Sequence, residues 1–300
     1  MDSRSDRVAF VLSGGASLGA VQVGMLRALY ERGIVPDLVV GTSVGAINGA
    51  FIASRPQTVE IADELAEIWR GVRRGQVFPL RPLNGLLGFV GSRDHLVPES
   101  GLRRLIAKHT TYERLEQTPI EFHVVAVDVL TGEELLLSRG PVVEAVMASA
   151  AIPAVLPPVF WEGRTLMDGG VANNTPISHA VALGARTVYV LATGHACALE
   201  QPPASALGMA LHALTLLAQS RLIADIENHR DHARLVVVPP PCPLASQPTD
   251  FSHAEELIER SLEDGRAFLD RGGTEGPPIR MGVHRSAQRH ARKKRAAGVA

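Results

Sequence analysis

The chain has 300 residues, of which 46% are hydrophobic and 20% are charged, and its formal net charge is -1. The length suits one large α/β domain or two small ones, and the composition is typical of a globular protein with a sizeable core. The near-zero net charge provides no overall field to attract nucleic acid, so a nucleic-acid-binding protein is not expected.

Two apolar stretches raise the question of a membrane segment. Val8–Leu26 carries no charge, but its glycines, serines and glutamine divide it into a strand, a loop and a helix, and no small-residue cleavage site is evident. Ala204–Ala218 is short for a membrane span, and His212 interrupts it. The two cysteines, Cys197 and Cys242, form no metal or disulfide spacing pattern and fit a reduced compartment. We therefore expect a soluble, cytoplasmic protein without a transmembrane helix.

Predicted strands and helices alternate along the chain. Strands are expected at Val8–Leu12, Leu38–Val40, Glu121–Val127, Glu134–Leu137, Thr165–Met167, Thr187–Leu191 and Leu235–Val238. Helices are expected at Leu18–Arg32, Ala46–Ala53, Val59–Arg70, Gly101–His109, Pro141–Ser149, Ile177–Leu183, Ala206–His229 and Ala254–Leu269. The segment from Gly71 to Pro98 is expected to be irregular. This alternation implies a mainly parallel sheet with helices on both faces.

The run Gly41-Thr42-Ser43-Val44-Gly45 lies where the second strand meets the next helix. A Gly-x-Ser-x-Gly sequence at a strand-to-helix turn is typical of a nucleophile elbow. The turn is so sharp that its flanks must lack bulky side chains, and it holds the serine beside the positive end of a helix. The motif is short and common, so an ordinary serine in a glycine-containing loop is the alternative.

A glycine-rich loop, Ser13–Gly19, separates the first strand from its helix. Its glycines allow backbone N–H groups to turn toward a shared point, and the helix terminus adds partial positive charge. The loop is therefore a candidate oxyanion hole for a serine nucleophile. A dinucleotide-binding loop is the rival interpretation, but the Gly-x-Gly-x-x-Gly spacing and the acidic residue after the second strand are missing. A purely structural role for this loop is a further alternative.

The general base that a serine nucleophile needs is less evident. A Ser-His-Asp hydrolase would place an aspartate and then a histidine after the serine. None of the later histidines has a setting that singles it out; they are His123, His179, His195, His212, His229, His232 and His253. Asp168-Gly169-Gly170 ends a short strand, and its glycine pair allows close approach to another loop. On its own this sequence is more typical of a turn.

These blocks together resemble the patatin-like phospholipases, of the bacterial type with a single patatin-like domain. Ser13–Gly19 is similar to the family's oxyanion loop, Gly41–Gly45 to its nucleophile motif and Asp168-Gly169 to its Asp-Gly motif. The stretch from Ala148 to Pro176 also resembles the family, and the likeness covers about Val8–Val190. The order and spacing of the motifs are far more specific than each motif alone.

The resemblance implies a three-layer α/β fold and a Ser43–Asp168 dyad without histidine. Asp168 would accept the Ser43 proton and later activate water, and the N–H groups of Gly14, Gly15 and Ala16 would stabilise the oxyanion. Because the unperturbed pKa of a carboxyl is about 4, the site must raise this pKa by burial or rely on positioning. The implied activity is hydrolysis of a phospholipid, lysophospholipid or other acyl ester through an acyl-serine, and no cofactor or metal is expected.

Two positions depart from the family's loop, which usually reads Gly-Gly-Gly-x-Arg/Lys-Gly. Ala16 replaces the third glycine and keeps its N–H, whereas Leu18 replaces the basic residue and removes its charge. Phospholipase activity is therefore less secure than acyl-ester hydrolysis in general. A Ser-His-Asp esterase, and a non-catalytic lipid- or partner-binding protein with a degenerate site, stay as alternatives.

The remaining signals concern membrane contact and the end of the chain. Leu83–Val90 holds an apolar cluster that suits either a lid over Ser43 or a loop packed on the core. The composition becomes basic near the end, so we expect an acyl-hydrolase domain over residues 6–271 and a solvated, disordered tail over residues 272–300. Attraction of this tail to anionic lipid is the alternative, which would make the protein peripheral on the membrane. The oligomeric state is not predicted.

Overall fold

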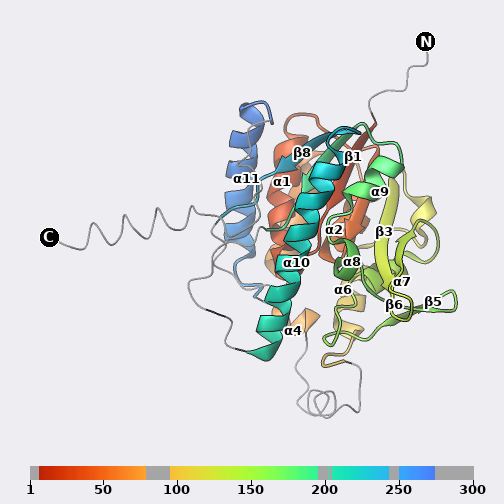
Figure 1. Cartoon of the computed structure of the whole chain (residues 1–300). Helices are drawn as coiled ribbons and strands as arrows, with labels where there is room; N and C mark the ends of the chain where they lie inside the picture. Colours follow the sequence, from red (N-terminus) through yellow and green to blue (C-terminus); the bar gives the residue numbers. More distant parts are fainter. Residues whose placement is uncertain (1–6, 79–94, 195–201, 203–204, 243–249, 274–300) are drawn as a thin grey trace.

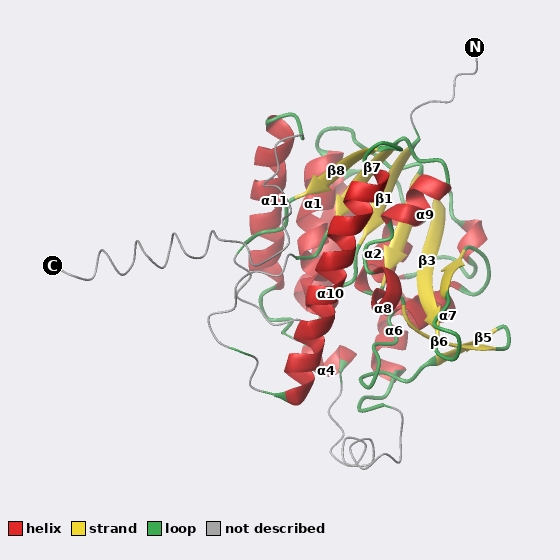
Figure 2. Cartoon of the chain, in the orientation of Figure 1, coloured by secondary structure: helices red, strands yellow, loops and turns green. Residues whose placement is uncertain are grey.

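An eight-stranded sheet forms the middle layer of the described part of the chain, and helices cover both of its faces (Figure 2). The computed structural model describes residues 7–78, 95–194, 202, 205–242 and 250–273. The strand order is β5-β6-β3-β2-β1-β7-β8, and β4 also pairs with β3. The strands are β1 (Val8–Leu12), β2 (Leu38–Thr42), β3 (Glu121–Asp128), β4 (Glu134–Leu137), β5 (Val159–Trp161), β6 (Arg164–Asp168), β7 (Thr187–Leu191) and β8 (Arg234–Val238).

The helices follow the strands in near-regular alternation (Figure 1). The α-helices are α1 (Ala20–Tyr30), α2 (Val44–Ala53), α3 (Val59–Gly71), α4 (Arg74–Val77), α6 (Ser100–His109), α7 (Val142–Ser149), α8 (Gly170–Asn173), α9 (Ile177–Ala182), α10 (Ala206–His229) and α11 (Ala254–Asp270). Two 3₁₀ turns are η1 (Ala16–Gly19) and η2 (Leu115–Gln117).

Two separate apolar cores lie on the two faces of the sheet, because successive strand residues point to opposite sides. Phe10 and Leu12 of β1 belong to the core that contains residues of α1, α2 and α11. Ala9 and Val11, which alternate with them, belong to the core that contains residues of α9 and α10. Burial on both faces explains why the central strands read as continuous apolar runs.

The predicted three-layer α/β architecture with a mainly parallel sheet is confirmed. β1, β2, β3, β7 and β8 are parallel to one another, whereas β4, β5 and β6 pair in antiparallel fashion. The sequence did not predict β5, because this strand has only three residues and its Phe160 is exposed. The helix expected at Leu18–Arg32 begins instead as η1, with α1 proper starting at Ala20.

The strand β3 pairs with both β2 and β6, and so brings two distant parts of the chain together. Its Val125 pairs with Thr42 at the end of β2, and the next residue, Ala126, pairs with Asp168 at the end of β6. The ends of β2 and β6 therefore meet beside consecutive residues of β3. This register places the residue after Thr42 next to Asp168.

Three further expectations concern the apolar cluster and the basic tail, the cysteines, and the absence of a transmembrane helix. The Leu83–Val90 cluster and the basic tail after residue 273 lie outside the described residues. Cys242 is disulfide-bonded, which the spacing of the cysteines did not predict. No helix within the described ranges combines the length and the hydropathy needed to span a bilayer.

Candidate active site

Ser43 occupies the turn between β2 and α2, as the elbow motif predicts. Its φ is 54°, a strained value for a residue with a side chain. A Cβ at Gly45 would lie 2.1 Å from the Leu12 carbonyl oxygen, and a Cβ at Gly41 would lie 2.6 Å from that of Gly45. Only glycine fits at these two positions, so the motif's glycines are required by the tightness of the turn.

The hydroxyl of Ser43 donates a hydrogen bond to Asp168, with an Oγ–Oδ2 distance of 2.7 Å. The other carboxylate oxygen, Oδ1, accepts the N–H of Gly170 at 2.7 Å. A Cβ at Gly169 would lie 2.3 Å from the Val125 carbonyl oxygen, so glycine permits the close approach of this turn to β3. The structure thus brings together two residues that are 125 positions apart in the sequence.

Burial changes the acidity of the carboxyl group. Asp168 and Ser43 are each only 5% exposed. Burial raises the pKa of Asp168 to about 6, against the opposing effect of the hydrogen bonds from Ser43 and Gly170. A carboxylate with this pKa is a stronger base than an exposed one and is still ionised near neutral pH. This is the burial effect that the sequence argument required.

The glycine-rich loop lies beside Ser43, but its three expected donors are not equivalent. The N–H of Gly14 donates to the Asn174 carbonyl oxygen at 3.1 Å, so it is not free to bind an oxyanion. The N–H groups of Gly15 and Ala16 have no acceptor among the described residues, as the start of a 3₁₀ turn leaves them open. Ala16 has a φ of 50°, which costs about 1 kcal/mol for a non-glycine residue.

A buried network of polar side chains holds the start of the Ser13–Gly19 loop, and the sequence analysis did not identify it. The side-chain amide of Gln22 donates to the carbonyl oxygens of Ser13 (2.9 Å) and Leu191 (3.0 Å). Asn48 donates to Gln22 Oε1 at 2.8 Å and accepts from Trp69 Nε1 at 3.0 Å. Gln22 and Asn48 are fully buried polar residues in helices whose buried positions are otherwise apolar, which was the available signal. The two Gln22 bonds hold the end of β1 and the start of the loop, and Asn48 holds the Gln22 side chain.

Ser149 is a second residue that sequence reasoning did not single out. Its hydroxyl accepts the backbone N–H of Ser43 at 2.8 Å, and its side chain is fully buried at the end of α7. The bond satisfies the amide at the strained position of the elbow. Ser149 therefore holds the backbone of Ser43 without contacting its hydroxyl.

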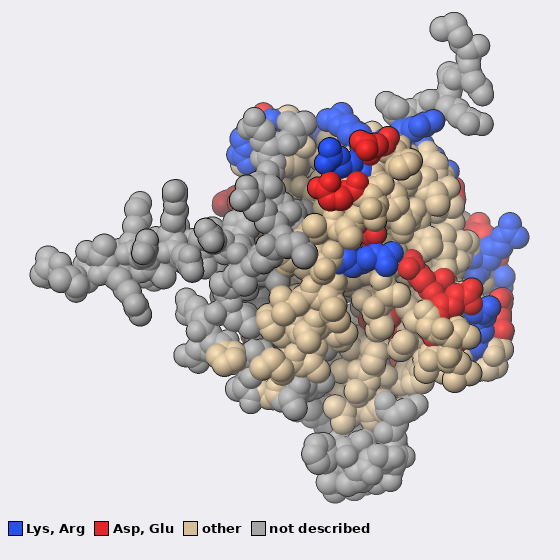
Figure 3. Space-filling view, viewed as in Figure 1, with Lys and Arg blue, Asp and Glu red and all other residues tan. Residues whose placement is uncertain are grey.

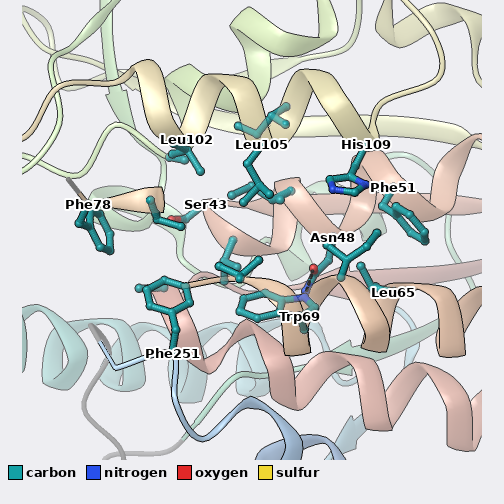
Figure 4. A pocket seen from close by; sticks show the side chains of 18 of the residues that line it. Ser43, Asn48, Phe51, Leu65, Trp69, Phe78, Leu102, Leu105, His109 and Phe251 are labelled. Atoms are coloured by element: carbon teal, nitrogen blue, oxygen red, sulfur yellow. Dashed lines mark hydrogen bonds between the residues drawn. The ribbon is translucent and has the colours of Figure 1, made fainter. Parts of the chain in front are cut away.

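Two pockets meet at Ser43. The apolar pocket runs between α2, α3 and α6, with Phe78 and Phe251 at one end and Phe51 and His109 at the other (Figure 4). Its one side-chain amide, Asn48, is buried and has both ends hydrogen-bonded. The second pocket contains Asp168 and both free loop amides, and it is bordered by α8 and α10.

The histidines do not form a triad with Ser43 in the described part of the chain. His123 bonds Ser138 at 2.7 Å and Glu121 at 2.8 Å, His179 pairs with Glu134, and His229 bonds the Asp225 carbonyl oxygen. His109 shares the apolar pocket with Ser43 but lies at its far end (Figure 4). His195 lies outside the described residues. Among the described residues, no cluster of three histidine, cysteine or acidic side chains is placed to hold a metal ion.

A serine at a strand–helix elbow, beside a buried carboxylate in a three-layer α/β fold, defines the class of nucleophile-elbow proteins. The comparison with protein families makes the assignment narrower. The family model described as patatin-like phospholipase matches residues 10–181. The chain belongs to the patatin-like phospholipase family, as the three motifs predicted.

Curated relatives of the chain carry related names. Lysophospholipase nte1 of Aspergillus terreus is 29% identical over 194 residues, which cover 62% of this chain and 12% of that protein. A patatin-like phospholipase domain-containing protein of Caenorhabditis elegans, ZK370.4, is 31% identical over 62% of this chain and 14% of its own length. The uncharacterized NTE family protein Rv1063c of Mycobacterium tuberculosis is 31% identical over 59% of this chain and 46% of its own length. The chain thus spans less than half of each of these relatives.

Two solved structures align with most of this chain at low sequence identity. VipD of Legionella pneumophila aligns with 89% of this chain and 66% of its own, at 15% identity and a TM-score of 0.46. The type III effector protein ExoU aligns with 90% of this chain and 54% of its own, at 14% identity and a TM-score of 0.37.

Proposed function

We propose that the protein is a serine acyl-hydrolase that cleaves lipid acyl esters with a Ser43–Asp168 dyad. The observation that supports this most directly is the 2.7 Å bond from the Ser43 hydroxyl to the buried Asp168 carboxylate at the junction of two pockets. Family membership supports the lipid class of the substrate. Ser43 and Asp168 also lie in the sequence segments that resemble the family's nucleophile and Asp-Gly motifs.

The proposed reaction has two halves. Asp168 takes the proton from Ser43 Oγ as this oxygen attacks the ester carbonyl carbon, and the negative charge moves to the carbonyl oxygen. The N–H groups of Gly15 and Ala16 stabilise that oxyanion. The carbon–oxygen bond to the alcohol then breaks, and the alcohol leaves with the proton from Asp168. A water molecule then gives a proton to Asp168 and attacks the acyl carbon. The bond from this carbon to Ser43 Oγ breaks, Oγ takes the proton back from Asp168, and the fatty acid is released.

The two pockets suggest how the substrate is divided. The apolar pocket suits the acyl chain, because burial of methylene groups is favourable and most of its lining side chains are apolar. The second pocket, which contains Asp168 and the free amides, suits the alcohol part. Leu18 lines this second pocket where the family usually has a basic residue, so no cation is supplied at that position for a phosphate. We therefore place acyl esters without a phosphate ahead of phospholipids and lysophospholipids.

The test is a panel of short and long acyl esters, lysophospholipids and phospholipids, measured with wild type and Ser43→Ala. We expect hydrolysis that falls by at least about 10³-fold in the variant, because the nucleophile is lost. Activity that persists in Ser43→Ala would reject Ser43 as the nucleophile. Hydrolysis that survives in Asp168→Ala but is lost in a histidine variant would instead favour a Ser-His-Asp esterase.

A further inference from the structure

The amino-terminal half of α10 exposes apolar side chains on more than one side. From Ser205 to Ser220 the sequence contains no Asp, Glu, Lys or Arg. Met209, Leu216 and Leu217 are 47%, 45% and 67% exposed. Leaving large apolar groups in water is unfavourable, so a contiguous group of them marks a contact surface.

The charges on this side of the molecule lie elsewhere. In the space-filling view, the surface over the lower part of α10 is uncharged, whereas acidic and basic side chains gather above it and along the right edge (Figure 3). The first charged residue of the helix is Arg221, which pairs with Asp225 at 2.9 Å. The exposed half of α10 is therefore apolar and has no charge of its own.

The exposed face is continuous with the pocket of Ser43. Leu214, which is 38% exposed, lines the second pocket together with Ser43 and Asp168. Val171 of α8 lines the same pocket and is 43% exposed. The apolar surface thus borders the second pocket, which contains Ser43 and Asp168.

We propose that one α10 face, defined as Met209, Leu214 and Leu217 together with Val171 of α8, docks on an uncharged or zwitterionic lipid surface. An apolar helix face inserts at the boundary of head groups and acyl chains, and the gain scales with the apolar area buried. Because the face has no basic residue, anionic lipid is not required for this attachment. Docking would place the second pocket against the lipid from which the substrate is taken. The inference rests on the proposed function only for the identity of that substrate.

The experiment measures binding of the full chain to vesicles of pure phosphatidylcholine by co-sedimentation, in a Ser43→Ala background so that no lipid is hydrolysed. Leu217→Glu should weaken partitioning about tenfold, because one exposed leucine is lost from the contact and a charge is put in its place. The matched control is Val35→Glu. Val35 is also exposed, at 43%, but it precedes β2 and so lies at the opposite end of the sheet from Ser43. This control should bind like the parent.

A gain-of-function variant gives a second readout. Both tryptophans of the chain, Trp69 and Trp161, are buried, so Leu217→Trp adds the first exposed indole. Tryptophan favours the membrane interface. Its emission should shift to shorter wavelength with phosphatidylcholine vesicles, and partitioning should be at least as strong as in the parent.

Three outcomes would overturn the proposal. One is equal binding of Leu217→Glu and Val35→Glu. Another is binding that appears only with phosphatidylserine and disappears in high salt, which would assign attachment to the basic tail. The third is a dimer in solution that Leu217→Glu dissociates, without vesicle binding by the wild type, which would assign the face to a second copy. Failure of the proposed function is separate, because it would show as absent hydrolysis of soluble esters with vesicle binding intact.

Discussion

The residue with the most unusual environment is Asp168, whose pKa is raised to about 6 by burial. In the unfolded chain an aspartate has a pKa of about 4. Between these values the unfolded chain is ionised and the folded chain is protonated, so the free energy of unfolding falls as pH rises from about 4 to about 6. The ionised carboxylate therefore destabilises the fold at neutral pH by about 3 kcal/mol.

Asp168→Asn should consequently stabilise the protein. The amide is neutral, its oxygen can accept the Gly170 N–H, and its NH₂ group can donate to Ser43 Oγ. The variant should therefore unfold at higher denaturant concentration than wild type at pH 7. The difference should be about 2–3 kcal/mol above pH 6 and should vanish below about pH 4. Chemical denaturation at pH 4, 6 and 8 measures it. A difference that does not depend on pH would show that Asp168 is not buried as an ionised group.

Ser149 tests whether the backbone of the elbow must be held. Ser149→Ala leaves the Ser43 N–H without its acceptor, which costs about 1–3 kcal/mol for a buried donor. We expect kcat to fall about tenfold with KM nearly unchanged, because the serine is displaced rather than the substrate pocket. Ser261→Ala is the control, since Ser261 is also fully buried and donates to the Ile258 carbonyl oxygen in α11. Equal kcat in both variants would give Ser149 a purely structural role.

Single residues of the site were only partly predictable. Motifs identify Ser43 and Asp168 as candidates, but their distance depends on the register of β3, which no local sequence signal specifies. The occupied amide of Gly14 depends on the Asn174 carbonyl oxygen, 160 positions away. Ser149 looks like any serine at a helix end until α7 is packed against the elbow.

At the scale of elements, the sharp turn at Ser43 depends on the close approach of α2 to β1. Gly45→Ala places a Cβ 2.1 Å from the Leu12 carbonyl oxygen, and this backbone cannot yield without moving the central strand. We expect destabilisation of more than about 3 kcal/mol, or loss of soluble protein, from this overpacking. Gly71→Ala, at the end of α3 with nothing within 4 Å of the new Cβ, should be neutral or stabilising by up to about 1 kcal/mol. Thermal unfolding of both variants makes the comparison, and equal melting temperatures would refute the packing argument.

Elements with a clear apolar run or a helical period were predicted well, and the shortest elements were not. The strands at Val8–Leu12, Glu134–Leu137 and Thr187–Leu191 have the bounds that the sequence predicted. The short β5 and the single-turn α8 carry too few residues for any period to show. Their placement comes from pairing with β6 and from the turn after Asp168, which are tertiary effects.

At the scale of the whole molecule, we propose that the folded unit ends with α11. This helix packs on α1, and its last contacts include the Arg32 guanidinium with Asp270. A chain that ends at Gly273 should keep its melting temperature within about 3 °C and its activity on soluble esters, because residues beyond a packed helix add little to the core. A chain that ends at Ser252 should not fold, since it loses buried Leu257, Ile258 and Phe268. If the chain that ends at Gly273 does not fold, the domain boundary lies within the tail instead.

The central claim is that Asp168 activates Ser43 without a histidine, and its most direct test is the rate of labelling by a fluorophosphonate. Intact mass and peptide mapping would be followed over time for wild type, Asp168→Asn, His109→Ala and Ser43→Ala. The account predicts one adduct on Ser43 in wild type and in His109→Ala at similar rates, labelling slowed at least about 100-fold in Asp168→Asn, and none in Ser43→Ala. Equal labelling rates in wild type and Asp168→Asn, or folded wild type that is not labelled at Ser43, would contradict it.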